Sequence, residues 1–572
     1  GEHIKFLVDG VPVVGRLNGE IDLGQLNLHN VKQVEIVEGP MSVIYGSNAL
    51  AGVINIITGE NSYSTLKVNS SAYLESVGIY NFTADATLKK KKWMGSLAVA
   101  RNFFEGFSLT EDTRTMRWKP KRQYNADASI NYTSSDFQLK FSSAFFNEMI
   151  KDKGELLKPY FETAFDSDFI TNRLTTNLDA KAKVAKDRYI NVLASYSYYN
   201  RIKNTYFIDL TTLEKILSAN AFDQDTSVFG QYLLRAEFSK STLNSKFNYQ
   251  LGIDLNEETG YGKRILDKRQ QIGDFAAFLS VKLQPVVRFM VQPGLRVAYN
   301  TKYKAPIVYS LNTKWDMLED LSLRASFGKG FRTPSLKELY LEFVDVNHNI
   351  RGNENLKAED SKNVNMALSY HKEKATYDYG AEISMFYNYI HNQIKLAILD
   401  YDEALYTYIN LDEFVSQGYQ LTFNNRLYNW LEIKTGFGQT GRKIMHGKSL
   451  NSPMFYSTDL LATINYLWRK TDVKFALNYK YNGDYPEVYA NSDGQVFSVI
   501  TGAYHTMDVN ASRSFFDRRL DAQVGVKNLF DVTGVAVRGD AGGGIHGGGG
   551  SGESAVAWGR TFFVRLAYRF HK

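Results

Sequence analysis

The sequence contains no cysteine and only 10 prolines in 572 residues, and its formal net charge is a modest +6. Without cysteine, neither a disulfide framework nor a thiolate metal site can form. No run of about 18 consecutive apolar residues occurs, which excludes a membrane-spanning helix. The basic residues are spread along the chain instead of forming one stripe, so the sequence does not indicate a nucleic-acid partner.

Aromatic residues, in contrast, are abundant: tyrosine occurs 37 times and phenylalanine 36 times. Beyond residue 60, the chain consists of segments of about ten residues in which apolar and polar side chains alternate. This alternation is typical of strands that face lipid on one side and water on the other. The sequence has no nucleophile elbow, zinc-binding helix or phosphate-binding loop, so we do not expect an enzyme.

Ten short polar turns alternate along the chain with longer connections. The turns are expected at residues 89–92, 134–136, 185–187, 239–245, 284–285, 318–320, 371–374, 426–429, 469–472 and 517–519. Ten turns at one end of the strands require eleven connections at the other, and hence 22 strands. We therefore expect an all-β fold in which residues 61–572 form a 22-stranded antiparallel transmembrane β-barrel.

Two further features favour a membrane barrel. Four of the six tryptophans lie close to the short turns, where an interfacial aromatic girdle belongs: Trp93, Trp315, Trp430 and Trp468. The last strand, at 561–570, places aromatic and aliphatic residues on one face and Arg565 and Arg569 on the other. One face suits lipid and the other an aqueous lumen.

The most specific motif occupies residues 34–58. A strand at 34–37 ends at Gly39-Pro40, because proline cannot donate to a ladder; a turn containing Tyr45-Gly46-Ser47 follows, and then a second strand. This stretch resembles the end of the plug domain of TonB-dependent outer-membrane receptors. The resemblance implies that residues 1–60 are the C-terminal part of a globular plug in the barrel lumen. It also implies that the other part of the plug and the TonB-binding segment precede residue 1.

The same resemblance implies active import across the outer membrane of a Gram-negative bacterium by a multi-pass receptor. Its expected partners are the TonB–ExbB–ExbD complex, outer-membrane lipid, a small-molecule metal chelate and, on the long loops, a surface lipoprotein. We expect haem or a ferric siderophore as transported cargo, with no catalytic cofactor. Cobalamin is the alternative, followed by an oligosaccharide or peptide. A passive porin or adhesin barrel is the rival class, and it would not need a plug.

A second resemblance concerns two boxes at residues 328–340 and 352–359. They look like the paired boxes of haem receptors, which cobalamin and some siderophore receptors share, although Thr333, Glu354 and Ala358 depart from the usual pattern. We place the boxes at the two ends of the seventh external loop. Between them lies His348, whose neutral imidazole could ligate haem iron.

Further cargo-binding residues are expected on the plug apex and the external loops. The full set is Arg16, Asn18, Tyr340, His348, Met445, His446 and His546. Arg16 stands where some haem receptors have a histidine, and its guanidinium would suit an anionic ferric siderophore. For each loop histidine, a solvated side chain that binds nothing is the alternative. We also expect Glu35 and Glu38 to pair with barrel arginines, because an unpaired buried charge is costly.

Overall fold

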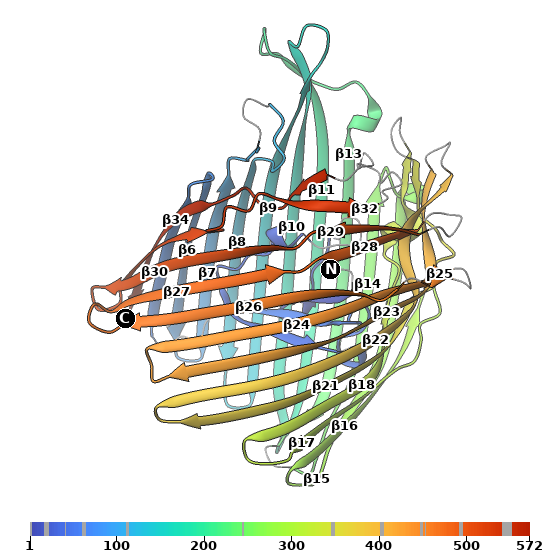
Figure 1. The fold of residues 1–572 in the computed structure, drawn as a ribbon. Helices are drawn as coiled ribbons and strands as arrows, with labels where there is room; N and C mark the ends of the chain where they lie inside the picture. The colour runs from blue at the N-terminus through green and yellow to red at the C-terminus, as the bar shows by residue number, and fades with distance from the viewer. Residues whose placement is uncertain are drawn as a thin grey trace.

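Antiparallel strands dominate the computed structural model, in which a closed barrel surrounds a small N-terminal sheet (Figure 1). The structure describes residues 3–15, 22–39, 42–59, 64–109, 114–242, 245–344, 349–400, 405–446, 450–451, 453–490, 496–539 and 552–572. No helix within these ranges is long and apolar enough to cross a membrane.

The barrel has 22 strands, as predicted, and closes where the last strand pairs with the first. The strands are β5 (Leu66–Glu75), β6 (Ile79–Lys90), β7 (Trp93–Phe104), β8 (Lys121–Thr133), β9 (Phe137–Leu156), β10 (Thr163–Ala185), β11 (Arg188–Asp209), β13 (Asp225–Lys240), β14 (Phe247–Gly262), β15 (Arg269–Val286), β16 (Phe289–Asn300), β17 (Val308–Asp316), β18 (Leu321–Arg332), β21 (Glu359–Lys374), β22 (Tyr377–Asp400), β23 (Leu405–Leu427), β24 (Leu431–His446), β26 (Phe455–Trp468), β27 (Val473–Asn482), β30 (Tyr504–Phe515), β31 (Leu520–Lys527) and β34 (Thr561–His571).

Short turns join the strands at one end of the barrel, close to the predicted positions, but two of them lie further along the chain. One follows Val286 instead of ending at residue 285, because β15 continues past Pro285 through a register shift between Leu283 and Val286. The end of a strand tolerates a proline, which cannot donate a backbone hydrogen bond to the neighbouring strand. The other follows Lys374, because the polar residues from His371 onward still pair with β22. Polar composition alone therefore indicates the rim of the barrel but not which residues form the turn.

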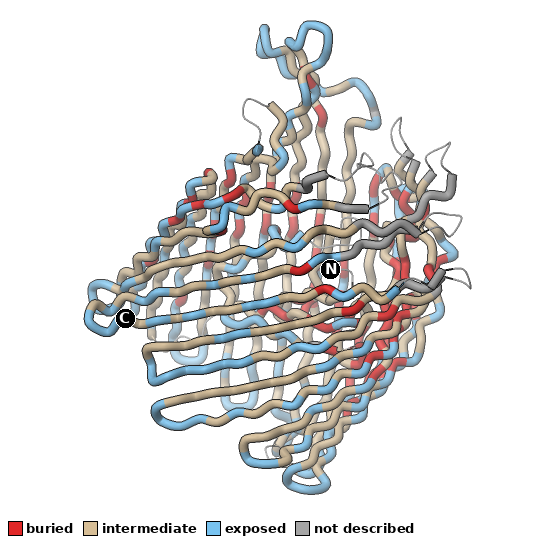
Figure 2. Tube along the Cα trace, in the orientation of Figure 1, coloured by how far each residue is buried: buried red, intermediate tan, exposed pale blue. Residues whose placement is uncertain are grey.

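The outer wall carries the expected apolar face. On β34, the residues Phe562, Val564, Leu566 and Tyr568 are all exposed, in keeping with the predicted lipid-facing side. Trp93, Trp315 and Trp468 are also exposed and lie at the short-turn ends of β7, β17 and β26. Figure 2 shows that buried residues gather toward the long-loop ends of the strands from β18 to β23.

The plug part is a four-stranded sheet in the order β2-β1-β4-β3. Its elements are β1 (Ile4–Val8), β2 (Val11–Pro12), η1 (Leu23–Gln25), β3 (Val31–Glu38), α1 (Ser42–Tyr45) and β4 (Gly52–Thr58). Strands β1 and β4 are parallel, while β3 and β4 are antiparallel, so the motif at 34–58 forms the predicted strand, turn and strand. Leu7, Ala49 and Val53 are the buried residues of its apolar core.

The remaining elements lie in the long connections. They are β12 (Lys215–Leu217), η2 (Ala221–Asp223), η3 (Leu266–Lys268), α2 (Leu336–Tyr340), β19 (Glu342–Val344), β20 (Asn349–Arg351), β25 (Leu450–Asn451), β28 (Tyr485–Ala490), β29 (Val496–Thr501), β32 (Gly534–Gly539) and β33 (Gly552–Ala555). The last four form a sheet of their own. The connection from β18 to β21 is the seventh at this end, so both boxes lie where we expected them.

Candidate functional site

The first box folds into a short capped helix directly after β18. Pro334 and Ser335 follow the end of the strand, and the Ser335 hydroxyl accepts a hydrogen bond from the Glu338 amide (3.2 Å). The Glu338 carboxylate in turn accepts one from the Ser335 amide (2.7 Å). This reciprocal capping satisfies two amides that would otherwise have no partner at the start of α2. The capping box therefore fixes the position of Glu338.

Four charged or polar side chains then form a buried group, which we call the box network: Arg332, Glu338, Glu359 and His3. Arg332 donates to both Glu338 oxygens (3.0 and 3.1 Å) and to Glu359 (2.7 Å). His3 Nε2 lies 2.8 Å from the other Glu359 oxygen. The side chains of Arg332 and Glu359 are 0% exposed. A bidentate arginine between two carboxylates is the arrangement that allows such charges to be buried.

The box network connects three parts of the chain. Arg332 ends β18, Glu338 lies in α2, and Glu359 begins β21 and belongs to the second box. His3, by contrast, comes from the plug, immediately before β1. The two boxes are thus paired with each other and with the plug, a contact that neither motif indicates alone.

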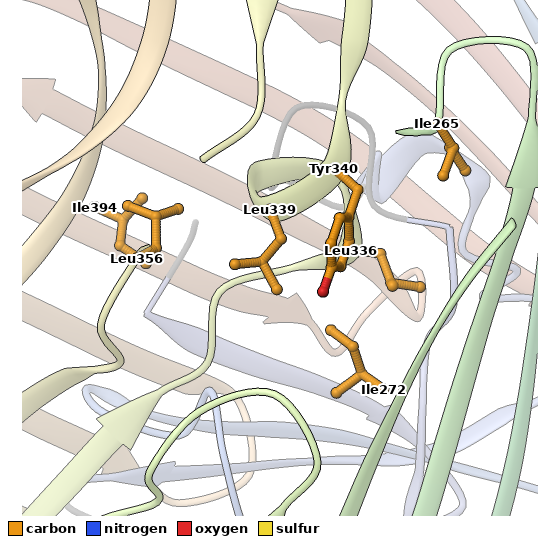
Figure 3. Packing of buried hydrophobic residues seen from close by; sticks show 7 residues of the cluster. All are labelled: Ile265, Ile272, Leu336, Leu339, Tyr340, Leu356 and Ile394. Carbon is orange, nitrogen blue, oxygen red and sulfur yellow. The ribbon is translucent and has the colours of Figure 1, made fainter. Parts of the chain in front are cut away.

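An apolar cluster packs around α2 (Figure 3). Its members come from the loop before β15, from β15, from α2, from the second box and from β22: Ile265, Ile272, Leu336, Leu339, Tyr340, Leu356 and Ile394. Gly352 allows the close return of the chain, because an added Cβ would lie 2.6 Å from backbone atoms of Leu339 and Leu341. Packing of these residues holds α2 against the barrel wall.

The plug motif itself contacts the first box. The Asn48 amide donates to the Phe331 carbonyl (3.0 Å), and the Asn363 side chain donates to the Leu50 carbonyl (2.9 Å). Val43 packs with Phe331 and Val308, all three of them buried. The two stretches that carry the sequence resemblances therefore meet along β18 and β21, where apolar packing and direct hydrogen bonds join plug and barrel.

On the opposite side, the boundary between plug and barrel is polar. Gln25 donates to Glu148 (2.9 Å) and accepts from Arg173 (2.9 Å), and all three side chains are buried. The Asp9 carboxylate accepts hydrogen bonds from Lys140 of β9 (2.7 Å) and from the Thr58 hydroxyl (2.6 Å). The second of these bonds joins the end of β1 to β4 within the plug.

A polar cavity is lined by residues of the plug and of β13–β16. We call it the upper cavity; its volume is about 110 Å³. On the wall, Asp254 accepts from Arg235 (2.9 Å) and Arg296 (3.1 Å), and we call these three residues the charged triad. Lys5 enters from the plug and donates to the Tyr45 carbonyl (2.6 Å). Burial lowers the pKa of the Lys5 ammonium to about 8.

The structure describes only part of the predicted cargo site. Arg16, Asn18, His348 and His546 lie outside the described residues. Met445 and His446 end β24, where their backbones pair with β25, while their side chains fall outside the described part. Tyr340 is described, and it is buried in the apolar cluster with the Lys302 ammonium 5.2 Å from its ring. Their roles in cargo binding stay predictions.

The predicted ion pairs of the plug also stay predictions. Glu35 accepts a hydrogen bond from Asn55 (3.1 Å), and within the described ranges no arginine forms an ion pair with it. Glu38 pairs through its backbone with Gly52, and its side chain lies outside the described part. Three or more metal-ligating side chains do not gather anywhere in the described part of the chain.

Sequence reasoning missed the charged triad and the box network. Arg235, Asp254 and Arg296 each stand at a lumen-facing position within a strand that otherwise alternates toward lipid. A charge in the middle of such a strand was the available signal, because it marks the side that faces the polar lumen. Which of these charges meet could not be read from the sequence.

Two family models match the chain. One, described as TonB dependent receptor-like, beta-barrel, matches residues 61–529, and another, described as TonB-dependent Receptor Plug Domain, matches residues 1–53. The chain is 22% identical over 384 residues to the vitamin B12 transporter BtuB of Photobacterium profundum, covering 64% of this chain and 56% of the relative. It is 22% identical over 529 residues to the iron-regulated outer membrane virulence protein of Vibrio cholerae, covering 88% and 76%. The chain spans about half the length of the BtuB relatives it matches.

Solved structures of similar fold include two receptors for iron chelates. The siderophore receptor PirA from Acinetobacter baumannii superimposes with a TM-score of 0.78 at 16% identity, over 100% of this chain and 91% of that one. A mutant of the ferric enterobactin receptor PfeA from Pseudomonas aeruginosa gives 0.77 at 17% identity, with the same coverage. At such identities the likeness establishes the fold alone.

Proposed function

This chain belongs to the TonB-dependent receptor family, and we propose that it imports a scarce iron chelate across the outer membrane with energy delivered through TonB. The barrel is an outer-membrane barrel, and the family is one of transporters and not of enzymes. The observation that carries the proposal is the plug sheet held inside the closed barrel by the box network. A passive pore needs no such obstruction, whereas an energised importer needs a plug that is held at rest and moved on demand.

An iron chelate is favoured as cargo on three grounds. The solved relatives of similar fold include receptors named for siderophores and ferric enterobactin. The iron-regulated protein of Vibrio cholerae aligns over 88% of this chain, against 64% for the B12 transporter. Arg16, which we expect at the plug apex from the sequence, would suit an anionic chelate better than haem iron. Cobalamin is the second candidate, because B12 transporters are among the sequence relatives.

In this proposal, cargo binds from the outside to the long loops and the plug apex. The TonB–ExbB–ExbD complex then pulls on a segment that precedes the described residues, and the plug moves within the lumen. The cargo is released unchanged. In this proposal the protein binds and moves it without forming or breaking a covalent bond.

Growth of a deletion strain tests the assignment. The strain is supplied with haem, ferric siderophores or cobalamin as the sole source of the nutrient, with and without the gene restored on a plasmid. We expect restored growth on an iron chelate only. Restored growth on cobalamin alone would replace iron with the second candidate, and growth independent of the gene on every source would contradict import of these cargoes.

Substitution of His348 distinguishes haem from a ferric siderophore as cargo. If haem is bound through this histidine, His348→Ala weakens haem binding and changes the absorbance spectrum of the bound haem. If the cargo is a ferric siderophore, as we propose, His348→Ala leaves uptake unchanged, whereas Arg16→Ala reduces it. Matched spectra of bound haem in the wild type and in His348→Ala would remove His348 as an iron ligand.

A further inference from the structure

Two exposed arginines are neighbours on the outer, lipid-facing wall of the barrel. Arg101 of β7 and Arg122 of β8 belong to the outward-facing series of their strands, in which Val99 and Tyr124 are also exposed. In the ladder, Arg101 pairs with Tyr124, and Arg122 pairs with Phe103, so the two arginines are diagonal neighbours. Diagonal neighbours on one face of a sheet are about 7–8 Å apart, which long side chains can span. We call Arg101 and Arg122 the arginine pair.

The arginine pair shares one aromatic ring. The Cζ atoms of Arg101 and Arg122 lie 5.7 and 5.6 Å from the centre of the Phe103 ring. Within the described ranges, neither guanidinium forms an ion pair with a carboxylate. Glu105, two residues beyond Phe103, lies against Gly78 on the side of β6. Like charges that face each other across a sheet repel, so an anion bound next to both arginines would stabilise them.

The arginine pair lies at the long-loop edge of the apolar band. Residues 93–101 of β7 and 122–132 of β8, nine and eleven residues, run from the short-turn end to the arginines. At the short-turn end, the rings of Trp93 and Tyr132 lie 5.0 Å apart. A transmembrane β-strand crosses the hydrocarbon layer with about 9–11 residues. With the two aromatic rings at one interface, the arginines therefore lie at the other, at the height of the lipid headgroups.

Other charged side chains at this end of the barrel find partners within the protein. Lys329 of β18 pairs with Asp360 of β21 (3.6 Å), and Lys215 of β12 pairs with Asp168 of β10 (3.1 Å). The arginine pair instead presents two guanidinium groups to the membrane surface. Each guanidinium can donate two parallel hydrogen bonds to a phosphate, which matches its planar geometry.

We propose that the arginine pair binds a phosphate group of an outer-leaflet lipid whose acyl chains lie along the wall next to it. A lipid is the occupant, and not free phosphate, because the site continues directly into the lipid-facing surface. Exposed apolar side chains cover β7–β9 between the arginines and the short turns: Leu97, Val99, Ile130, Phe141 and Phe145. In the outer leaflet of a Gram-negative outer membrane, the phosphorylated lipid is lipid A of lipopolysaccharide. The site lies on the outer wall, so the proposal does not depend on the cargo.

Binding of lipid A to the purified protein tests the proposal. Native mass spectrometry in detergent measures the affinity for added bisphosphorylated lipid A. We expect a several-fold weaker affinity when Arg101→Ala and Arg122→Ala are combined. Arg269→Ala is the matched control, because Arg269 is exposed at the long-loop end of β15 and pairs with β14, which contains no arginine. Its affinity should equal that of the wild type. Equal affinities of the wild type and the double variant would overturn the proposal.

Two further probes separate the phosphate from the rest of the lipid. Lipid A without its phosphates should bind the wild type and the double variant equally weakly. If it binds the wild type as tightly as the bisphosphorylated form does, the acyl chains alone account for binding and the proposal is wrong. Inorganic phosphate should not displace bound lipid A from the wild type. Complete displacement would identify a general anion site and contradict a lipid occupant.

Thermal unfolding in vesicles gives an independent readout. A lipid that binds only the folded barrel raises the unfolding temperature. Adding lipid A to phosphatidylcholine vesicles should therefore raise this temperature in the wild type and in Arg269→Ala, and less in the double alanine variant. Arg101→Lys combined with Arg122→Lys should give an intermediate rise, because lysine keeps the charge without the paired donors. The same rise in the double alanine variant as in the wild type would contradict the site.

Discussion

Arg332 is the residue on which the pairing of the two boxes depends most. Its guanidinium is fully buried and pairs with two carboxylates, so Arg332→Ala leaves Glu338 and Glu359 without their main counter-charge. Breaking a buried ion pair in this way costs about 3–5 kcal/mol. We expect the folded barrel to lose its heat-resistant gel mobility at a distinctly lower temperature.

The control for this prediction is Arg324→Ala, an exposed arginine on the same strand. An exposed substitution of this kind changes stability by about 0.5 kcal/mol or less. Arg332→Lys keeps the positive charge but loses the two-pronged guanidinium. Its transition temperature should therefore lie between those of the wild type and of Arg332→Ala. Equal transition temperatures for Arg332→Ala and Arg324→Ala would show that the network does not stabilise the fold.

Lys5 gives the boundary between plug and wall a pH dependence. Burial lowers its pKa from 10.5 to about 8, so with the plug detached it binds a proton more tightly than with the plug in place. The contribution of Lys5 to the free energy of plug attachment therefore becomes more favourable as pH rises from about 8 to about 10.5. Below pH 8 this contribution is constant. Calorimetry of plug unfolding should show this rise in the wild type and not in Lys5→Met. A rise of the same size in Lys5→Met would show that other groups cause the pH dependence.

At the scale of elements, the sequence was most informative where one local rule decides the structure. Strict alternation predicted the strands, and the strand, turn and strand at 34–58 appeared as expected. The turn after β15 was misplaced, because a register shift let the strand pass Pro285. The contact between α2, the second box and the plug was not predicted, because it joins residues more than three hundred positions apart, such as His3 and Glu359.

The return of the second box onto α2 depends on one glycine. A Cβ at Gly352 would lie 2.6 Å from the backbone of Leu339, which cannot move away as a flexible side chain can. We expect Gly352→Ala to displace α2 and to make the seventh loop more sensitive to added protease on intact cells. Gly438→Ala is the matched control, because a Cβ there meets nothing within 4 Å. Identical cleavage of the two variants would contradict this role for Gly352.

At the scale of the whole molecule, the strand count followed from the sequence, whereas the upper cavity did not. Ten turns required 22 strands whatever the side chains in the lumen. The upper cavity depends on which lumenal side chains of β13–β16 stand at the same height as the plug, and that is set by barrel register and plug placement. The apolar contacts beside β18 and the charged triad on β13, β14 and β16 therefore emerge only from the assembled fold.

The central claim is that this chain takes up an iron chelate by energised movement of the plug. The most direct measurement is accumulation of radioactive iron, presented as haem and as ferric siderophores, in cells that carry the chain with and without a functional TonB. The account predicts cargo binding in both strains and accumulation only where TonB functions. Equal accumulation in both strains would show a passive pore and contradict it.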